Sequence, residues 1–443
     1  MSVEAPVPTR TPPAAPADGI PAVAPPTTTR RALLGLGLGN TLEWYDWMIF
    51  GLLAALIGPQ FFPSGDPVAA TLSALAVFAV GFAVRPLGGV LLGTVADKIG
   101  RRRVMLWSIG AMAATTLVIA VLPTYASIGL WAGVVLLVCR LVQGASTGIE
   151  APLSTAYAVE LSPAGREGRA AGLMSFFVNL GILLASLVSF LTSLVIGADA
   201  MLEWGWRVPF AFGAALGVVV IWLRRALPES LTEEDKTEAR DQGNTIWGGM
   251  RKHWLGLVAI VFVVGAAQAY NYAWNVGLPS LARGSFGEDP TWVFAITTAL
   301  AVVLLIGSPL TGMLADRATL SKTFVITRLM AIPTIFLILL YSEPGILGFA
   351  GVILGGSVVL VLNMTLYNVV ATSLMPKYCR GTGVALGYGI AVAVFGGTAS
   401  YLLVWLQNAG LDWVFPVYVA VLSAISVVAY LAARRSSGTF CGK

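Results

Sequence analysis

The chain has 443 residues, of which 57% are hydrophobic and 11% charged, and its mean hydropathy is +0.82. Soluble domains carry about 25% charged residues, so this composition excludes a soluble globular protein. The net charge of +5 is spread over short connections, which argues against nucleic-acid binding. Three scattered cysteines and one histidine predict neither a disulfide framework nor a metal site, and we expect no cofactor.

Residues 1–30 are rich in Pro, Ala and Thr and lack an apolar core, so they predict a disordered cytoplasmic tail rather than a signal peptide. The rest of the chain contains twelve apolar runs near the length of about 20 residues that crosses a bilayer. They lie at 33–58, 70–96, 104–123, 129–157, 169–197, 206–226, 254–281, 291–314, 323–341, 345–372, 381–407 and 412–432. An all-α integral membrane fold with twelve transmembrane helices is predicted.

The basic residues of the connections alternate from one side of these runs to the other. Connections assigned to the inside hold Lys98, Arg101 to Arg103, Arg166, Arg169, Arg224, Arg225, Lys236, Arg240, Arg251, Lys252, Arg317, Lys322, Lys377 and Arg380. Those assigned to the outside hold Arg283, with Arg207 at the edge of a span. Because Lys and Arg are retained on the cytoplasmic side, both termini are predicted to be cytoplasmic in a cell (inner or plasma) membrane.

One long polar connection divides the twelve runs into six and six. We expect an N-terminal bundle at 31–226, a cytoplasmic linker at 227–253, a C-terminal bundle at 254–433 and a tail at 434–443. The run from Gly312 to Arg317 repeats the spacing of Gly93 to Lys98, which indicates an internal duplication. Two pseudo-symmetric bundles of this kind place a substrate site between them at mid-membrane.

The connection after the second run reads Gly93-x-x-x-Asp97-x-x-Gly100-Arg101-Arg102. This pattern resembles the loop signature of the major facilitator superfamily, and the second copy lacks its Gly-Arg-Arg part. The alternative is a positive loop that only anchors topology. As gating residues we expect a larger set at the inner ends of the spans, namely Asp97, Arg101, Arg102, Glu160 and Asp316.

Ionisable residues within the runs are functional candidates, because each costs about 2.5–3.5 kcal/mol to insert at mid-bilayer. Glu43 and Asp46 lie three residues apart, so they share one helix face. Two neighbouring carboxylates suit a proton carrier, although either could instead pair with an arginine. Arg85 has the forked donor geometry that suits a carboxylate substrate, or it could be the fixed partner of Glu43 or Asp46.

The fourth run carries Arg140, Gln143, Thr147 and Glu150 on a single stripe, which must face protein or water. The stripe could bind substrate (Arg140, Gln143) or relay protons (Glu150). In the second half, polar and aromatic residues could orient a solute or anchor at the interface. They are Gln268, Tyr270, Asn271, Trp274, Asn363 and Tyr367. Arg328 is expected to reach the membrane surface.

With these residues in place, 31–433 resembles the metabolite:proton symporters of the major facilitator superfamily. The resemblance rests on Gly39-Asn40 to Asp46, Arg85-Pro86 to Gly89, Arg140 to Gly144, Glu150 and Trp204 to Phe210. Segments such as Phe62 to Gly65 and Phe395 to Tyr401 are most similar to α-ketoglutarate and related dicarboxylate permeases. Ile149 replaces a glycine that is usual in the family before Glu150, and Ser400 stands where the dicarboxylate subgroup usually has a glutamate.

The resemblance implies proton-driven import of a small organic acid through the cell membrane by a protein that acts as a monomer among lipids. Alternatives are a zwitterionic osmolyte such as proline or betaine, a cyclic or aromatic acid such as shikimate, or a transporter-like sensor without net flux. The absence of a His pair and of a Cys–His set argues against an intramembrane enzyme.

Overall fold

The computed structural model describes residues 26–99, 101–148, 158–159, 162–163, 165–225 and 243–438. Most of the predicted N-terminal tail, much of the predicted linker and the last five residues lie outside these ranges. Glu150 and Glu160 also lie outside them. The side chains of Asp97, Arg101 and Arg102 are likewise outside the described part, although their backbone belongs to helices.

Every regular element in the described ranges is helical. The first half comprises α1 (Pro26–Leu52), α2 (Ala54–Phe61), α3 (Pro67–Ile99), α4 (Arg101–Val121), α5 (Tyr125–Ile128), α6 (Trp131–Thr147), α8 (Glu167–Ile196), α9 (Ala198–Ala200) and α10 (Arg207–Arg225). After α12 (Gly243–Lys252), the second half comprises α13 (Trp254–Tyr272), α14 (Leu278–Gly284), α15 (Pro290–Arg317), α16 (Leu320–Ile335), α17 (Ile346–Gly355), α18 (Ser357–Ser373), α19 (Lys377–Ala391), α20 (Gly397–Asn408) and α21 (Val414–Ser437). Two π turns, η2 (Ala273–Gly277) and η4 (Val392–Gly396), join α13 to α14 and α19 to α20.

These helices account for the twelve predicted spans. Nine helical columns of the described part are long and apolar enough to cross a membrane, and a pair bent by 59° at 198–223 makes a tenth. Helix α6 is apolar but shorter. Helix α1 carries Asn40, Glu43 and Asp46, and these polar residues lower its hydropathy. The all-α membrane fold is therefore confirmed.

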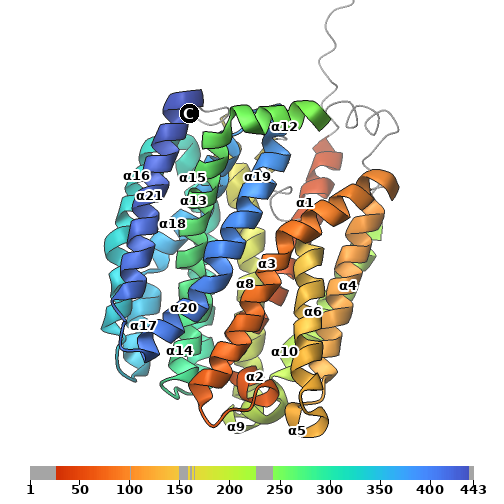
Figure 1. The fold of residues 1–443 in the computed structure, drawn as a ribbon, viewed down its shortest axis with the longest axis vertical. Coiled ribbons are helices and arrows are strands. Elements are labelled where there is room, and N and C mark those ends of the chain that lie inside the picture. Colours follow the sequence, from red (N-terminus) through yellow and green to blue (C-terminus); the bar gives the residue numbers. More distant parts are fainter. Residues whose placement is uncertain are drawn as a thin grey trace, which may run out of the picture.

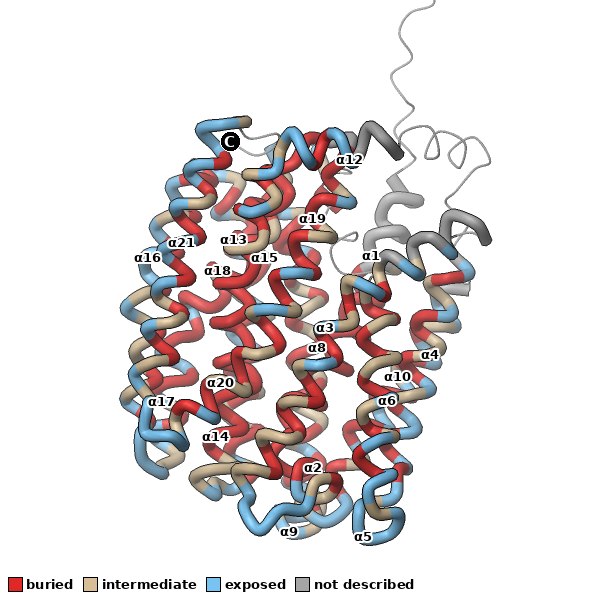
Figure 2. Tube along the Cα trace, in the orientation of Figure 1, coloured by how far each residue is buried: buried red, intermediate tan, exposed pale blue. Residues whose placement is uncertain are grey.

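The bundle has two distinct ends (Figure 1). Helix α12 and the C-terminal end of α21 lie at one end, which we call the α12 end, and α2, α5 and α9 lie at the other, the α9 end. Buried residues face the interior, whereas outward faces carry exposed apolar side chains such as Leu130, Trp222 and Val428 (Figure 2). A surface of this kind suits lipid rather than water.

Close contacts between backbones hold the first half together. Gly144 lies against the carbonyl of Gly81, Gly148 lies against the carbonyl of Arg85, and Gly88 lies against the backbone of Ala145. A side chain at any of these glycines would meet main-chain atoms, so α3 and α6 can approach this closely only because the residues are small. This contact fixes Arg85 and Arg140, on α3 and α6, relative to each other.

The two halves meet along several helix pairs. Helix α8 packs along α15, α3 packs on α20 and η4, and α2 packs on α14. Toward the α9 end, Gly51 lies against Val276 and Gly284 lies against Thr71. These contacts place the inner faces of α1 and α3 opposite those of α13 and α19.

Helices α8 and α15 touch along their whole length. At the α12 end Gly168 and Gly172 pack on Gly312. In the middle, Asn179 Nδ2 donates to Ser308 Oγ over 2.7 Å, and at the α9 end the hydroxyls of Ser193 and Thr291 are 2.7 Å apart. We call this contact the α8–α15 seam.

Candidate functional site

An ion pair joins α1 to α3 near the boundary between the halves. Arg85 Nη2 lies 2.6 Å from Glu43 Oε1, and the two side chains are 4% and 1% exposed. Of the two interpretations of Arg85, this structure therefore contains the pairing with Glu43. The charge of Arg85 also interacts with the hydroxyl groups of Tyr272 and Tyr388, which belong to the second half.

A second polar cluster lies inside the first half. Arg140 Nη1 is 3.5 Å from Asp46 Oδ2 and donates to Gln143 Oε1 over 2.7 Å. Gln143 Nε2 in turn donates to Asp46 Oδ1 and to Thr116 Oγ1, at 3.2 and 3.0 Å. Thr116 is also hydrogen-bonded to Asp46. All these side chains are buried, so Asp46 is enclosed by donors from α4 and α6.

Aromatic rings lie against the guanidinium groups of the two arginines. The Arg85 guanidinium carbon lies 4.5 Å from the centre of the Trp47 ring and 5.0 Å from that of Phe82. The corresponding carbon of Arg140 lies 4.4 Å from Trp47 and 4.2 Å from Phe50. Cation–π attraction of this kind stabilises a desolvated guanidinium by about 2 kcal/mol. Both positive charges are therefore tolerated in an apolar interior.

In the second half a line of amides and hydroxyls faces these pairs. Asn275 Nδ2 donates to Asn271 Oδ1 over 2.9 Å, and Asn271 Nδ2 lies 3.3 Å from Gln268 Oε1. Gln268 Nε2 lies 3.4 Å from the hydroxyls of both Tyr367 and Tyr388. Three of the predicted residues, Gln268, Asn271 and Tyr367, therefore lie together.

Other predicted residues of the second half lie elsewhere. Tyr270 and Trp274 stack on each other on the opposite face of the α13–η2 segment, and Trp274 Nε1 donates to the carbonyl of Ile353. Asn363 donates to Val359 of its own helix. We therefore leave these three out of the site. For the first two the cause is their spacing, because residues 270 and 274 lie about 160° and 120° around the helix from Gln268.

Arg328 does not reach the surface, so that prediction was wrong. It is 1% exposed, lies over Phe324 and donates to the carbonyl of Val263 over 2.8 Å. A guanidinium near the end of a span can donate its hydrogen bonds to the backbone of a neighbouring helix instead of to water at the membrane surface.

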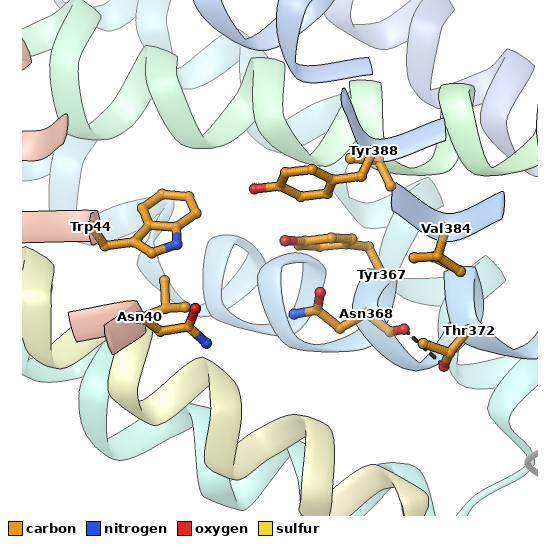
Figure 3. Close-up of a pocket in the computed structure, with 10 residues that line it drawn as sticks. Asn40, Trp44, Tyr367, Asn368, Thr372, Val384 and Tyr388 are labelled. Atoms are coloured by element: carbon orange, nitrogen blue, oxygen red, sulfur yellow. Dashed lines mark hydrogen bonds between the residues drawn. The ribbon is translucent and has the colours of Figure 1, made fainter. Parts of the chain in front are cut away.

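A small cavity opens between the halves (Figure 3). It is lined by Asn40, Trp44, Val178, Val264, Tyr367, Asn368, Ala371, Thr372, Val384 and Tyr388. The indole of Trp44 faces the hydroxyl groups of Tyr367 and Tyr388 across the space. Its volume is about 20 Å³, measured as space for the centre of a water molecule, which admits water but not an organic acid. The cavity lies toward the α12 end, because it reaches Thr372 at the end of α18.

Sequence reasoning missed Trp44, Thr116 and Tyr388. Trp44 stands in the quoted motif of the first span, but an aromatic residue there also suits a packed core. Thr116 and Tyr388 are single polar groups in apolar runs, and nothing in their local pattern separates them from residues that bond to their own helix.

Asp316 joins the halves at the α12 end. Its Oδ1 accepts a hydrogen bond from the Gly168 amide over 2.6 Å and its Oδ2 accepts one from the Arg169 amide over 3.2 Å. The Arg169 side chain lies 3.3 Å from the same carboxylate. A carboxylate at a helix N-terminus is stabilised by the free amides and the helix dipole, so Asp316 caps α8 from the other half.

The described residues do not contain the parts of a hydrolytic or metal centre. Residues 144–148 read Gly-Ala-Ser-Thr-Gly, which has the Gly-x-Ser-x-Gly spacing found around the nucleophile of many hydrolases. However, Ser146 lies buried within α6, and its carbonyl accepts a hydrogen bond from Ser108. The single histidine, His253, lies at the α12–α13 junction beside Ser437, 3.2 Å from its hydroxyl. Burial and the charge of Lys252 lower the pKa of His253 below its usual value. No group of three His, Cys, Asp or Glu within the described ranges is placed to bind a metal ion.

Comparison with known proteins places this geometry in context. A family model described as Major Facilitator Superfamily matches residues 36–396. The α-ketoglutarate permease of Escherichia coli (strain K12) is 31% identical over 414 residues, covering 92% of this chain and 95% of that protein. The proline/betaine transporter of Salmonella typhimurium is 31% identical over 411 residues, covering 89% and 81%. The solved proton:xylose symporter XylE, bound to 6-bromo-6-deoxy-D-glucose, has a TM-score of 0.72 at 16% identity, covering 94% and 97% of the two chains, and supports the fold alone.

Proposed function

Because the chain belongs to the Major Facilitator Superfamily, we propose that it is a proton-coupled symporter that imports a small organic acid by alternating access. A dicarboxylate such as α-ketoglutarate is the first candidate, which the identity to the E. coli permease supports. The relatives are transporters and not enzymes. The two units that move are the bundles 31–226 and 254–433, joined by the linker 227–253.

The buried Glu43–Arg85 pair is the observation on which this proposal rests. A desolvated ion pair is costly unless its geometry is good, and loss of one partner leaves an uncompensated charge. A substrate carboxylate can take the place of Glu43 on Arg85 if Glu43 is protonated or turns away. Anion binding and proton binding at this pair are then linked.

Asp46 and Glu43 are the proposed proton carriers, and Glu150 remains a third candidate. Asp46 has Arg140 and Gln143 as partners, so we assign these two residues to the proton site rather than to direct contact with substrate. Arg85, Gln268, Asn271 and Tyr367 form the proposed substrate site, to which we add Trp44 and Tyr388.

The membrane potential favours protons as the coupling ion. Each charge moved across 100 mV is worth about 2.3 kcal/mol, so a dianion that enters a negative cell faces about twice that barrier. Two protons cancel the charge, and a third makes entry electrically favourable. Substrate and protons must each shift the balance between the two states for this coupling to exist.

We assign the α12 end to the cytoplasm, with both termini there, and the membrane to the cell membrane. The positive connections support this orientation. The cavity toward the α12 end and the packed α9 end then correspond to a nearly closed inward-facing state. Asp97, Arg101, Arg102, Glu160 and Asp316 are the proposed inner gate, of which Asp316 contacts α8 here.

An osmolyte such as proline or betaine is the second candidate substrate. Trp44, Tyr367 and Tyr388 line the cavity, and aromatic rings bind quaternary or secondary ammonium groups. A zwitterion needs one guanidinium for its single carboxylate, and Arg85 meets that need. The similarity to a proline/betaine transporter also supports this candidate.

The test is uptake by purified protein in proteoliposomes. Labelled α-ketoglutarate, succinate, citrate, shikimate, proline and betaine are compared with and without an acid outside buffer. The proposal expects one acid to accumulate faster under the gradient, and faster uptake of betaine or proline alone selects the second candidate. Binding without accumulation of any compound indicates a sensor and overturns symport.

A further inference from the structure

We propose that Trp47 is a positioning residue that couples proton binding at Asp46 to anion binding at Arg85. The inference rests on the proposed function, and it concerns how two sites in one bundle influence each other. Trp47 belongs to neither ion pair, yet both guanidinium groups lie over its indole.

The indole of Trp47 contacts two like charges, one on Arg85 and one on Arg140. The guanidinium carbons of Arg85 and Arg140 are 4.5 and 4.4 Å from its centre, so they can be no farther apart than the sum of these distances. Each arginine has its own carboxylate, Glu43 or Asp46. Both carboxylates and the indole project from adjacent turns of α1. One helix face therefore carries both acids and the ring that contacts both of their arginine partners.

The surroundings fix the ring in place. Trp47 is 1% exposed and stacks on Phe82 with their centres 4.0 Å apart. A side chain at Gly81 would come within 3.0 Å of the indole, so the glycine leaves room for it. The indole N–H has no hydrogen-bond partner within the described part of the chain. Trp47 therefore acts through its faces and not through its polar atom.

In this arrangement, proton binding at Asp46 should strengthen anion binding at Arg85. While Asp46 is ionised, it offsets the charge of Arg140. When Asp46 takes a proton, the Arg140 charge loses that offset and adds to the field at Arg85, where an incoming anion is then bound more tightly. By linkage, an anion on Arg85 raises the proton affinity of Asp46 by the same factor.

Other charged or titratable groups lie near Asp46 or its partner. Arg140 and Cys139 on α6 and Tyr45 on α1 lie near Asp46, and Arg85 on α3 and Tyr272 on α13 lie near Arg140. All of these groups remain when Trp47 is replaced. A changed pH response of anion binding therefore reports a changed position of the guanidinium groups and not a lost charge. Without the ring, Arg140 can move from 3.5 Å to a shorter distance from Asp46, whereas Arg85 stays on Glu43, and the two sites become independent.

The test compares Trp47→Leu with Trp206→Leu in proteoliposomes. Trp206 is a matched control, because it is also fully buried and carries a single arginine, Arg207, 4.2 Å from its ring. With labelled α-ketoglutarate and labelled proline as probes, we expect the KM of the transported probe to fall about tenfold on acidification in the wild type and in Trp206→Leu. In Trp47→Leu we expect a KM that changes less than threefold, with counterflow exchange retained. A full pH response of KM in Trp47→Leu overturns the proposal.

A second measurement does not depend on transport. Infrared difference spectra of purified protein give the pH midpoint of the Asp46 carboxyl band, which is identified by its absence in Asp46→Asn. We expect Trp47→Leu to lower the proton affinity of Asp46 about tenfold, because Arg140 closes on it, and Trp206→Leu to leave it unchanged. An unchanged midpoint in Trp47→Leu overturns the positioning role even if neither probe is transported. A shifted midpoint without uptake contradicts only the proposed substrates.

Discussion

At the scale of single residues, two carboxylates on the same helix face have different neighbours. Glu43 meets an arginine at the boundary between the halves, where residues of α13 and α19 are close. Asp46 is enclosed by Thr116, Arg140 and Gln143 within the first half. In the proposed function, Glu43 therefore responds to a solute between the bundles as well as to a proton, and Asp46 responds to a proton alone.

Replacement of Arg85 by lysine tests the solute site. A compact ammonium cannot keep a forked contact, and a charge-assisted hydrogen bond is worth about 1.5–3 kcal/mol, so we expect Arg85→Lys to reduce the initial uptake rate about tenfold or more. The measurement is uptake of labelled substrate in proteoliposomes. Arg283→Lys is the control, because Arg283 donates to loop carbonyls near the α9 end. Equal losses in both variants would remove Arg85 from the site.

Removal of the charge of Asp46 tests the proton site. We expect Asp46→Asn to abolish accumulation driven by a pH gradient while exchange of labelled for unlabelled substrate continues, because the asparagine keeps the shape but takes no proton. Asp199→Asn, at an exposed position in α9, should leave both activities unchanged. Gradient-driven accumulation in Asp46→Asn would contradict the assignment.

Sequence reasoning worked at this scale where a charge stood in an apolar run. The cost of burying a charge marks Glu43, Asp46, Arg85 and Arg140 whatever the tertiary structure. This cost does not identify the interaction partners of each charge, because the partners depend on how the helices are rotated and tilted. Tyr388 and Thr116 were missed for that reason, and Tyr270 was predicted although it packs on the far face of α13.

At the scale of elements, contacts between backbones decide where the site residues lie. Helices α3 and α6 touch through Gly88, Gly144 and Gly148, and these contacts set the positions of Arg85 and Arg140, which both contact Trp47. A shift of either helix would change both ion pairs at once.

We expect Gly144→Ala to lower the free energy of unfolding by about 1–3 kcal/mol, the usual cost of overpacking. The added methyl group would meet the Gly81 carbonyl, which cannot move without its helix. Thermal unfolding of the purified protein in detergent gives the measurement. Gly110→Ala on α4 is the matched control, since nothing lies within 4 Å of that position, and it should gain up to about 1 kcal/mol from helix propensity. Equal melting temperatures would contradict the close contact.

The contact of Asp316 with the N-terminus of α8 should contribute to stability. Asp316→Ala removes two amide partners at a helix N-terminus and should cost about 0.5–2 kcal/mol. Arg169→Ala should cost only about 0–1 kcal/mol, because its side chain is 46% exposed and surface ion pairs are weak. Thermal unfolding of the two variants gives the comparison. A larger loss in Arg169→Ala would show that the ion pair, and not the cap, joins the halves.

At the scale of the whole molecule, the halves are in contact near the α9 end and along the α8–α15 seam, and a small cavity lies between them toward the α12 end. This asymmetry is the expected form of one state of a carrier. The fold itself was predicted from the sequence, because the length of the apolar runs and the alternation of basic loops are local properties. The state and the size of the cavity were not, since they depend on contacts between distant helices.

We expect a cysteine at Asn368 to react with an impermeant thiol reagent from the α12 side only. Asn368 lines the cavity, whereas Thr71 lies in the packed contact near the α9 end. Asn368→Cys and Thr71→Cys are made in a variant that lacks Cys139, Cys379 and Cys441, and are labelled in inverted vesicles and in intact spheroplasts. Labelling of Asn368→Cys should be at least about tenfold faster in inverted vesicles. Preferential labelling in spheroplasts would reverse the proposed orientation or state.

The α8–α15 seam has a thermodynamic consequence. Because glycine contacts and hydrogen bonds join these helices from one end to the other, the halves can rotate about them while most of the apolar surface in the seam stays buried. Apolar surface that becomes exposed at the α12 end is then compensated by apolar surface that becomes buried at the α9 end, and the reverse. The change in heat capacity between the two states should therefore be small. The balance between the two states should therefore vary little with temperature, and a ligand shifts it by its difference in affinity for the two states.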